Sequence, residues 1–157
     1  AFGSVLAALV VLGAGWFTVQ NAIPGAATEA RAGDIEAWSP ERVAALQAQG
    51  KPVFVNFTAA WCITCIANER VALSRQEVKG AFAKLGVVYL KADWTNRDSR
   101  IAKALAEQGR AGVPLYLFYP ARKEAQAEIL PQLLTVDGLI AAAERAAGRN
   151  ARTAALP

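Results

Sequence analysis

Short apolar runs alternate with longer amphipathic segments through most of the chain after residue 38. Three runs rich in β-branched and aromatic residues predict buried strands at 52–58, 87–93 and 114–120. A fourth strand is expected at 127–133, at an edge of the sheet, because Pro131 has no N–H group to donate. The segments around these strands predict helices at 39–50, 62–73, 74–86, 95–109 and 136–148.

Residues that typically begin and end helices support these boundaries. The expected N-terminal signals are Ser39 followed by Pro40, Ser74 in a capping box with Glu77, Thr95 or Asn96, and Thr135. Glycines at positions 50, 86 and 109 follow three of the helices, where glycine is common.

The order of these elements predicts the fold class. Strands connected through helices are expected to lie parallel, whereas the adjacent strands at 114–120 and 127–133 should form an antiparallel hairpin. We therefore predict an α/β sandwich, with a central mixed sheet flanked by helices, in one domain at residues 37–148. Residues 149–157 are rich in Ala and are expected to form a flexible tail.

The first 28 residues carry no charged side chain, and residues 1–19 are almost wholly apolar or small. This length matches the ~20 residues that a helix needs to cross a bilayer, so we expect a transmembrane helix at 1–20. A secretory signal, an expression remnant and a buried soluble helix are the alternatives. Residues 21–36 are small, polar and interrupted by Pro and Gly, which is typical of a linker. Residues 29–52 hold three basic and four acidic side chains. Segments on the cytoplasmic side of a membrane helix usually carry an excess of positive charge, which is missing here, so we expect the domain on the outer side of the membrane.

The net charge of +4 and the pI near 9.3 could suggest a nucleic-acid partner. The basic residues are mixed with acidic ones, however, and no stripe of Lys and Arg alternates with aromatic residues. We therefore expect a solvated surface and no nucleic-acid binding.

Both cysteines of the chain, Cys62 and Cys65, lie in the segment AAWCITCIAN with two residues between them. A structural disulfide that closes so short a loop would remove little chain entropy. A metal site is also disfavoured, because zinc usually takes four Cys or His ligands and the chain has no His and no Met. We predict no metal, since a metal centre would need a second protomer. A redox couple is the remaining interpretation.

The position of the pair in the predicted fold favours redox chemistry. A strand that ends at Thr58 leads into a helix whose first turn carries Cys62, where unpaired N–H groups and the helix dipole stabilise a thiolate. Cys62 is therefore expected to be the exposed nucleophile. Cys65, one turn later, would attack the mixed disulfide and release the partner. A CxxC motif after a strand in a βαβ pattern is typical of this chemistry.

The sequence resembles the thioredoxin fold and, more narrowly, the C-terminal domain of DsbD-type thiol:disulfide interchange proteins, including ScsB-like relatives. The matching stretches are KPVFVNFTAAWCITC, VVYLKADWTNRD and GVPLYLFYP, within about residues 37–147. The resemblance implies a redox-active Cys62–Cys65 disulfide without a bound cofactor. It also implies that the apolar N-terminal segment is the last helix of a membrane electron-carrying domain.

The resemblance assigns roles to residues outside the cysteine pair. Pro114 would be the cis-proline that faces the active site, and Val113 would offer its backbone to an incoming peptide. Asn56 stands where the family has a buried acid, and this departure puts that proton-transfer role in doubt because Asn cannot accept a proton at neutral pH. Glu69 matches the family's second acidic position. It lies on the helical face of Cys65, where it would raise the thiol pKa or carry a proton, unless it is simply a solvated carboxylate.

Two tryptophans and the residues between the cysteines complete the candidate site. Trp61 is expected either to shield the disulfide and shape a partner surface or to cap the core. Trp94 is expected to serve the loop and helix cap that follow the strand at 87–93. The two residues between the cysteines, Ile63 and Thr64, include no His or Lys that could stabilise a thiolate. We therefore expect the cysteine couple to be closer to a reductant than to a strong oxidant.

The expected function is protein-disulfide reduction at the bacterial inner membrane, with the globular domain in the periplasm. The dithiol would receive electrons from a membrane domain of the same protein and pass them to a periplasmic disulfide-bearing protein or a sister domain. Two alternatives remain. One is a singly anchored thioredoxin-like reductase for cytochrome c maturation, and the other is a thiol-based metal carrier or binding module.

Overall fold

The computed structural model describes residues 34–148. Within that range, no helix is both long and apolar enough to span a bilayer. Three predictions concern residues outside the described range. They are the transmembrane helix at 1–20, the first part of the 21–36 linker, up to residue 33, and the tail at 149–157.

A mixed sheet of five strands forms the centre of the domain, in the order β1-β3-β2-β4-β5. Its strands are β1 (Ile35–Ala37), β2 (Val53–Thr58), β3 (Val88–Asp93), β4 (Leu115–Tyr119) and β5 (Glu128–Ile129). The three strands β1, β3 and β2 run parallel to one another, whereas β4 is antiparallel to both β2 and β5. The predicted α/β class, the mixed sheet and the late hairpin are thus confirmed.

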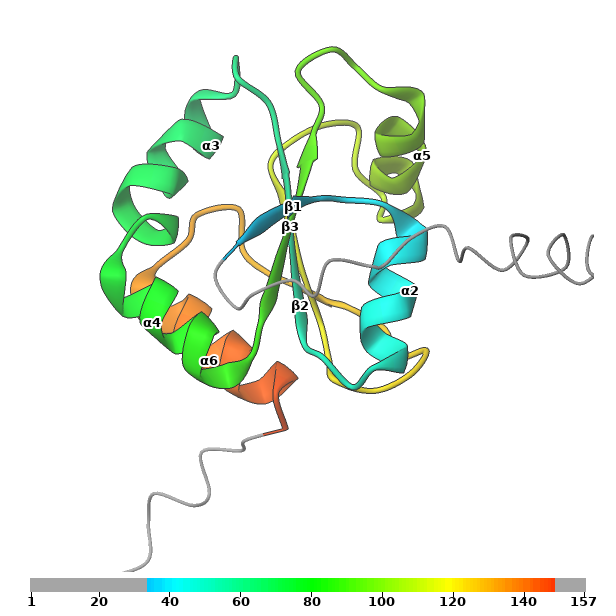
Figure 1. The fold of residues 1–157 in the computed structure, drawn as a ribbon. Helices are drawn as coiled ribbons and strands as arrows, with labels where there is room; N and C mark the ends of the chain where they lie inside the picture. The colour runs from blue at the N-terminus through cyan, green and yellow to red at the C-terminus, as the bar shows by residue number, and fades with distance from the viewer. Residues whose placement is uncertain (1–33, 149–157) are drawn as a thin grey trace, which may run out of the picture.

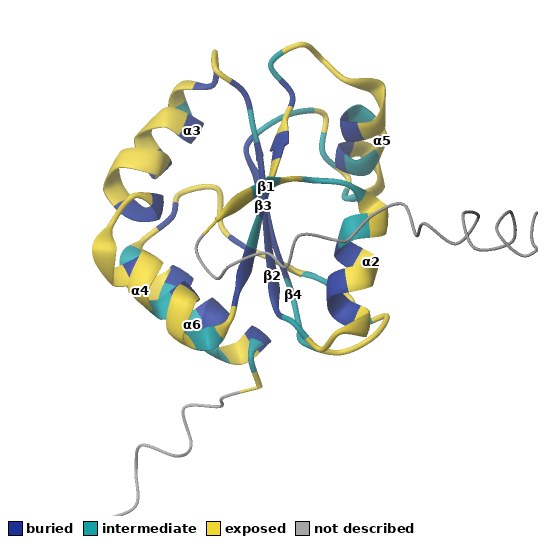
Figure 2. Cartoon of the chain, viewed as in Figure 1, coloured by how far each residue is buried: buried dark blue, intermediate teal, exposed yellow. Residues whose placement is uncertain are grey.

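Helices cover both faces of this sheet. They are α2 (Pro40–Ala48), α3 (Ile63–Asn68), the π-helix η1 (Glu69–Leu73), α4 (Gln76–Leu85), α5 (Ser99–Glu107) and α6 (Val136–Ala146). Figure 1 shows α3, α4 and α6 on one side of the sheet, and α2 and α5 on the other. The central strand β2 is therefore buried on both faces, from Val53 to Phe57 (Figure 2).

The core has one layer on each side of the sheet. Phe54 on β2 packs against Phe82 on α4 and Phe118 on β4, beneath α4 and α6. On the opposite face, Leu46 of α2 and Leu105 of α5 cover the other side chains of β2. These two layers hold β2 rigidly, and the candidate site lies directly after its last residue.

Two predicted helix starts are confirmed and two are wrong. The hydroxyl oxygens of Ser39 and Thr135 accept hydrogen bonds from backbone N–H groups in the first turns of α2 and α6. Ser74 does not cap α4, because its N–H bonds to Glu69 and its hydroxyl to Arg70, so it ends the preceding π-helix instead. Arg75 is the N-cap residue of α4 and makes no side-chain capping bond.

The start of α5 also differs from the expectation of Thr95 or Asn96. Asp98 is the N-cap residue, and its carboxylate accepts hydrogen bonds from the N–H groups of Arg100 and Ile101. Thr95 is unavailable as a cap because its hydroxyl is engaged by Asp93 and by the backbone of Ala60.

Strand β1 was not predicted, and its residues Ile35 and Glu36 fall within the range assigned to the linker. It has three residues, too few to show an alternating pattern, and it forms by pairing Ile35 with Tyr89 on β3. Strand β5 lies at the predicted edge but is shorter than expected. The N–H of Leu130 makes a last bond to the carbonyl oxygen of Tyr116, and Pro131 then has no N–H to continue the ladder.

Candidate active site

The two cysteines form a disulfide at the junction between β2 and α3. The Cys62–Cys65 bond has an S–S distance of 2.05 Å and joins Cα atoms 5.2 Å apart. Cys62 is the N-cap residue of α3, and its Sγ atom accepts a hydrogen bond of 3.2 Å from the N–H of Cys65. The predicted disulfide and its place at a helix start are therefore confirmed.

The disulfide is less exposed than the sequence suggested. Cys62 is 7% exposed and Cys65 is 5% exposed, because both pack against Ala59 and the partly buried Val113. The expectation of an exposed Cys62 is therefore wrong for the disulfide-bonded state. The neighbouring Ile63 is 83% exposed, so an apolar side chain lies at the surface directly after Cys62.

The residues before β4 lie where the family resemblance placed them. The peptide bond between Val113 and Pro114 is cis, as predicted. Val113 packs against the cluster formed by Ala59, Cys62 and Cys65. The segment that precedes β4 therefore covers one side of the disulfide.

The loop after β3 is hydrogen-bonded to the loop that leads into the cysteines. Thr95 connects the two loops: its carbonyl oxygen accepts from the indole N–H of Trp61 at 3.1 Å, and its hydroxyl oxygen accepts from the N–H of Ala60 at 2.9 Å. Asp93 accepts hydrogen bonds from the hydroxyl and the backbone N–H of Thr95, and these bonds lower the pKa of the Asp93 carboxyl. This arrangement gives Asp93 and Thr95 a structural role in joining the two loops.

The two tryptophans have different environments. Trp61 is 48% exposed, so the interpretation that it caps the core is wrong, and its position beside Cys62 fits a partner surface. Trp94 is 8% exposed, and its ring belongs to the hydrophobic layer beneath α2 and α5. Its backbone serves the loop after β3 by accepting the N–H of Arg97, as expected, whereas the helix cap is made by Asp98.

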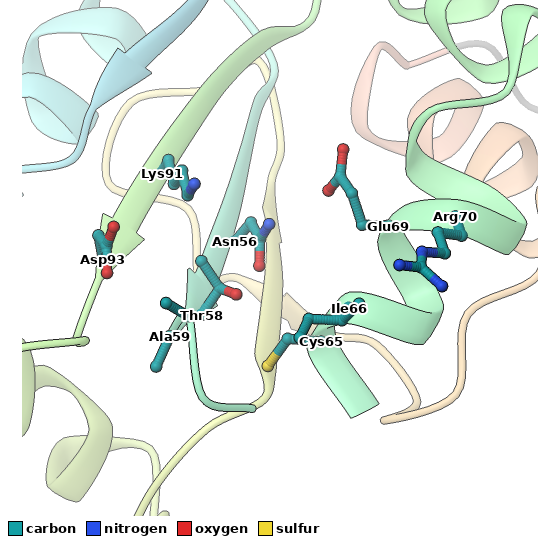
Figure 3. A pocket seen from close by; sticks show the side chains of 10 residues that line it. Asn56, Thr58, Ala59, Cys65, Ile66, Glu69, Arg70, Lys91 and Asp93 are labelled. Carbon is teal, nitrogen blue, oxygen red and sulfur yellow. The ribbon is translucent and has the colours of Figure 1, made fainter. Parts of the chain in front are cut away.

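A polar pocket of about 360 Å³ lies behind Cys65. Its walls include Asn56 and Thr58 from β2, Cys65 and Glu69 from the helix, and Lys91 and Asp93 from β3. Figure 3 shows the Glu69 carboxylate turned from the helix toward the sheet. The structure therefore brings three of the predicted site residues, Asn56, Cys65 and Glu69, to one cavity.

Asn56 is almost completely buried in this pocket wall, at 3% exposure. Its side-chain N–H group donates a hydrogen bond of 2.7 Å to the hydroxyl of Tyr89, whereas its Oδ1 atom has no partner among the described residues. Burial raises the pKa of the Tyr89 hydroxyl well above its usual range, so this group stays protonated. Asn56 therefore presents a neutral, polar oxygen where an acid would present a charge.

Glu69 is exposed and begins the π-helix η1, where the backbone widens after α3. Its negative charge adds to the effect of burial in raising the pKa of Tyr116. Glu69 is thus the carboxylate that reaches this pocket from the same helical segment as Cys65, as the helical spacing predicted.

Asn68 is a structural residue of the site that the sequence reasoning missed. It is 2% exposed, donates to the hydroxyl of Tyr116 and the carbonyl oxygen of Gln132, and accepts from the N–H of Leu134. These bonds tie the helix of the cysteines to β4 and to the segment before α6. The signal in the sequence was an Asn inside a helix, a position where this side chain usually has a bonding partner.

The described part of the chain holds no group of three or more His, Cys, Asp or Glu side chains that could bind a metal ion.

Comparison with known proteins agrees with this geometry. Residues 34–121 match the family model described as thioredoxin-like. The chain belongs to the thioredoxin-like family. It is 37% identical over 83 residues to the thiol:disulfide interchange protein DsbD of Yersinia enterocolitica, and 34% identical over 76 residues to DsbD of Cronobacter sakazakii. These matches cover 52% and 48% of this chain but only 14% and 13% of the relatives.

A solved structure supports the same relationship. The oxidised C-terminal domain of DsbD from Neisseria meningitidis superposes with a TM-score of 0.53 and 25% identity, over 68% of this chain and 94% of that domain. The resemblance to a DsbD-type thioredoxin-like domain is therefore confirmed.

Proposed function

We propose that this domain is a protein-disulfide reductase that exchanges its Cys62/Cys65 dithiol with disulfides of other proteins. The observation that carries the proposal is the Cys62–Cys65 disulfide at the start of α3, bordered by Val113 and by the exposed Trp61. The DsbD relatives, which are thiol:disulfide interchange proteins, support the same chemistry.

The reaction begins with the reduced domain. The Cys62 thiolate attacks one sulfur of the partner disulfide, a mixed disulfide forms, and the other partner sulfur leaves as a thiolate. The Cys65 thiolate then attacks the Cys62 sulfur and releases the partner as a dithiol. Two electrons pass to the partner, and the domain returns to the disulfide form that the structure describes.

Cys62 is suited to the first attack because it is the N-cap residue of α3, next to the exposed side chains of Trp61 and Ile63. The N–H of Cys65 bonds to the Cys62 sulfur, and a hydrogen bond of this kind favours a thiolate over a thiol. An extended segment of the partner would pair with the backbone of Val113, next to Pro114, as an added strand.

The second attack requires Cys65 to lose a proton. Its side chain borders the polar pocket that also receives the Glu69 carboxylate. We assign Glu69 as the proton acceptor, acting through water in this pocket. Asn56 cannot take the proton, but its unpaired Oδ1 atom can orient such a water.

The partners and location follow from the DsbD relationship and complete the proposal. The domain would receive electrons from a membrane domain of the same protein at the bacterial inner membrane. It would pass them to a periplasmic disulfide-bearing protein or a sister domain. The full upstream sequence tests this assignment: several further membrane helices support it, whereas a single anchor supports a free-standing thioredoxin-like reductase.

Trapping of the mixed disulfide tests the proposed chemistry. A Cys65→Ser variant, reduced and mixed with oxidised insulin, should form a covalent adduct through Cys62 that dithiothreitol removes. The matched Cys62→Ser variant should form little adduct, because the N-cap position and the N–H bond that favour a thiolate belong to Cys62. Equal trapping by both variants, or none by either, contradicts the proposal.

A further inference from the structure

Arg97 lies against two tryptophan rings, one of which belongs to Trp61, the residue before Cys62. The centre of its guanidinium lies 5.3 Å from the centroid of the Trp61 ring and 5.4 Å from that of Trp94. The two rings are themselves 6.0 Å apart and tilted by 56°. A guanidinium in such a place is attracted to both ring faces, so its position is fixed relative to Trp61 and hence to Cys62.

The backbone also holds Arg97 in place. Its φ angle is +56°, a left-handed conformation that residues other than glycine seldom adopt, and its N–H bonds to the carbonyl oxygen of Trp94 at 3.0 Å. Uncommon backbone conformations of this kind cluster at binding and active sites. The side chain is therefore directed by its own turn, and not only by the rings that it touches.

The charge of Arg97 is not neutralised within the described domain. None of the ion pairs among residues 34–148 includes Arg97. Asp93 and Asp98, the acidic residues of its own loop, accept backbone N–H groups of Thr95 and of the first turn of α5. Arg100, three residues later, is instead paired with Glu41 at 3.0 Å.

A guanidinium presents a planar set of N–H donors that matches a carboxylate. Stacking on the rings uses the faces of this group and leaves the donors at its edge for another molecule. Trp61 is 48% exposed and directly precedes Cys62 in the chain, and Arg97 lies against its ring. A substrate side chain that packs on the exposed Trp61 ring would therefore meet the Arg97 guanidinium.

We propose that Arg97 selects protein disulfides flanked by an acidic residue, by binding the carboxylate while Cys62 attacks the neighbouring sulfur. This inference rests on the proposed reductase function and adds a substrate class to it. The competing explanation is that Arg97 only packs the Trp61 ring in place. Under that explanation, the charge of the substrate would not affect the rate.

The test uses three disulfide-linked peptides that differ only at the residue beside the cysteine, which is Asp, Asn or Lys. We expect the reduced wild-type domain to react with the Asp peptide about two- to fivefold faster than with the Asn peptide, the range of a surface charge pair, and slowest with the Lys peptide. The preference should shrink in 0.5 M salt, because exposed charges are screened at about 3–4 Å there.

Variants separate charge recognition from packing. Arg97→Gln should remove the preference for Asp, whereas Arg100→Gln, which removes a charge of the same sign nearby, should keep it. Wild-type rates that are equal for the Asp and Asn peptides, or a preference that survives in Arg97→Gln, would overturn the inference while leaving the reductase function intact. Failure of the wild-type domain to reduce any of the peptides would overturn both.

Discussion

The sulfur of Cys62 accepts a hydrogen bond of 3.2 Å from the backbone N–H of Cys65. The same geometry places Cys62 at the surface end of α3 and Cys65 at the wall of the polar pocket. The two thiols of the reduced domain are therefore expected to differ in reactivity, although they are only three positions apart.

Alkylation of the reduced domain measures this difference. We expect iodoacetamide to modify Cys62 about tenfold faster than Cys65, because the hydrogen bond from the N–H of Cys65 gives the Cys62 sulfur more thiolate character. Peptide mass spectrometry after short exposures gives the two rates. The oxidised domain is the control and should not react. Faster labelling of Cys65 would contradict the assignment of Cys62 as the nucleophile.

Replacement of the pocket carboxylate should slow the second half of the reaction. We expect Glu69→Gln to slow release of the partner from the mixed disulfide by about tenfold or more, because Cys65 then lacks its proton acceptor. The first step, formation of the mixed disulfide, should change little. Rapid-quench analysis of the mixed disulfide with insulin resolves the two steps.

Glu77→Gln provides the matched control, since Glu77 is an exposed carboxylate on α4 that pairs with Arg75. This variant should release the partner at the wild-type rate. If Glu69→Gln behaves in the same way, Glu69 is a solvated carboxylate without a role in the reaction.

Removal of the Asn68 side chain should destabilise the domain. Asn68→Ala leaves the N–H of Leu134 without its buried partner and removes the bonds to Tyr116 and Gln132. We expect the free energy of unfolding to fall by about 2–4 kcal/mol, measured by urea denaturation. Asn96→Ala, at an exposed position, should change it by less than about 0.5 kcal/mol.

The Thr95 hydroxyl is expected to control the titration of Asp93. In the wild type, hydrogen bonds from Thr95 lower the pKa of Asp93, so this carboxylate stabilises the fold above its unfolded pKa of 3.8 and loses that effect as the pH falls through its lower folded pKa. Thr95→Val removes the hydroxyl bond and should raise the pKa of Asp93 toward its ordinary value. NMR titration of the carboxyl group measures the shift, and an unchanged pKa would contradict the assigned cause.

Local sequence patterns were sufficient to predict most of the fold. The buried strand around Phe54 and the helix that begins after Ser39 each carry their own signal, in apolar runs and in capping residues. Strand β1 carries none, because its three residues form a strand only by pairing with β3. The cap of α5 was misplaced because the Thr95 hydroxyl is used by Ala60, a contact between loops 35 residues apart.

The residues of the candidate site also differ in whether the sequence alone could predict them. The cysteine pair, Pro114 and Glu69 could be found from spacing and family resemblance. The burial of Cys62 could not, since it depends on Val113, which comes from a distant part of the chain. The position of Arg97 against two tryptophan rings likewise results from the docking of one loop on another.

The most direct test of the account is the transfer of electrons from the isolated dithiol to a protein disulfide. The fully reduced domain, freed of reductant and kept under nitrogen, is mixed with excess oxidised insulin and followed by intact mass spectrometry. We predict that each domain loses two hydrogen atoms, forms the Cys62–Cys65 disulfide and opens one insulin disulfide, while Cys62→Ser opens none. A wild-type domain that stays reduced beside intact insulin would contradict the central claim.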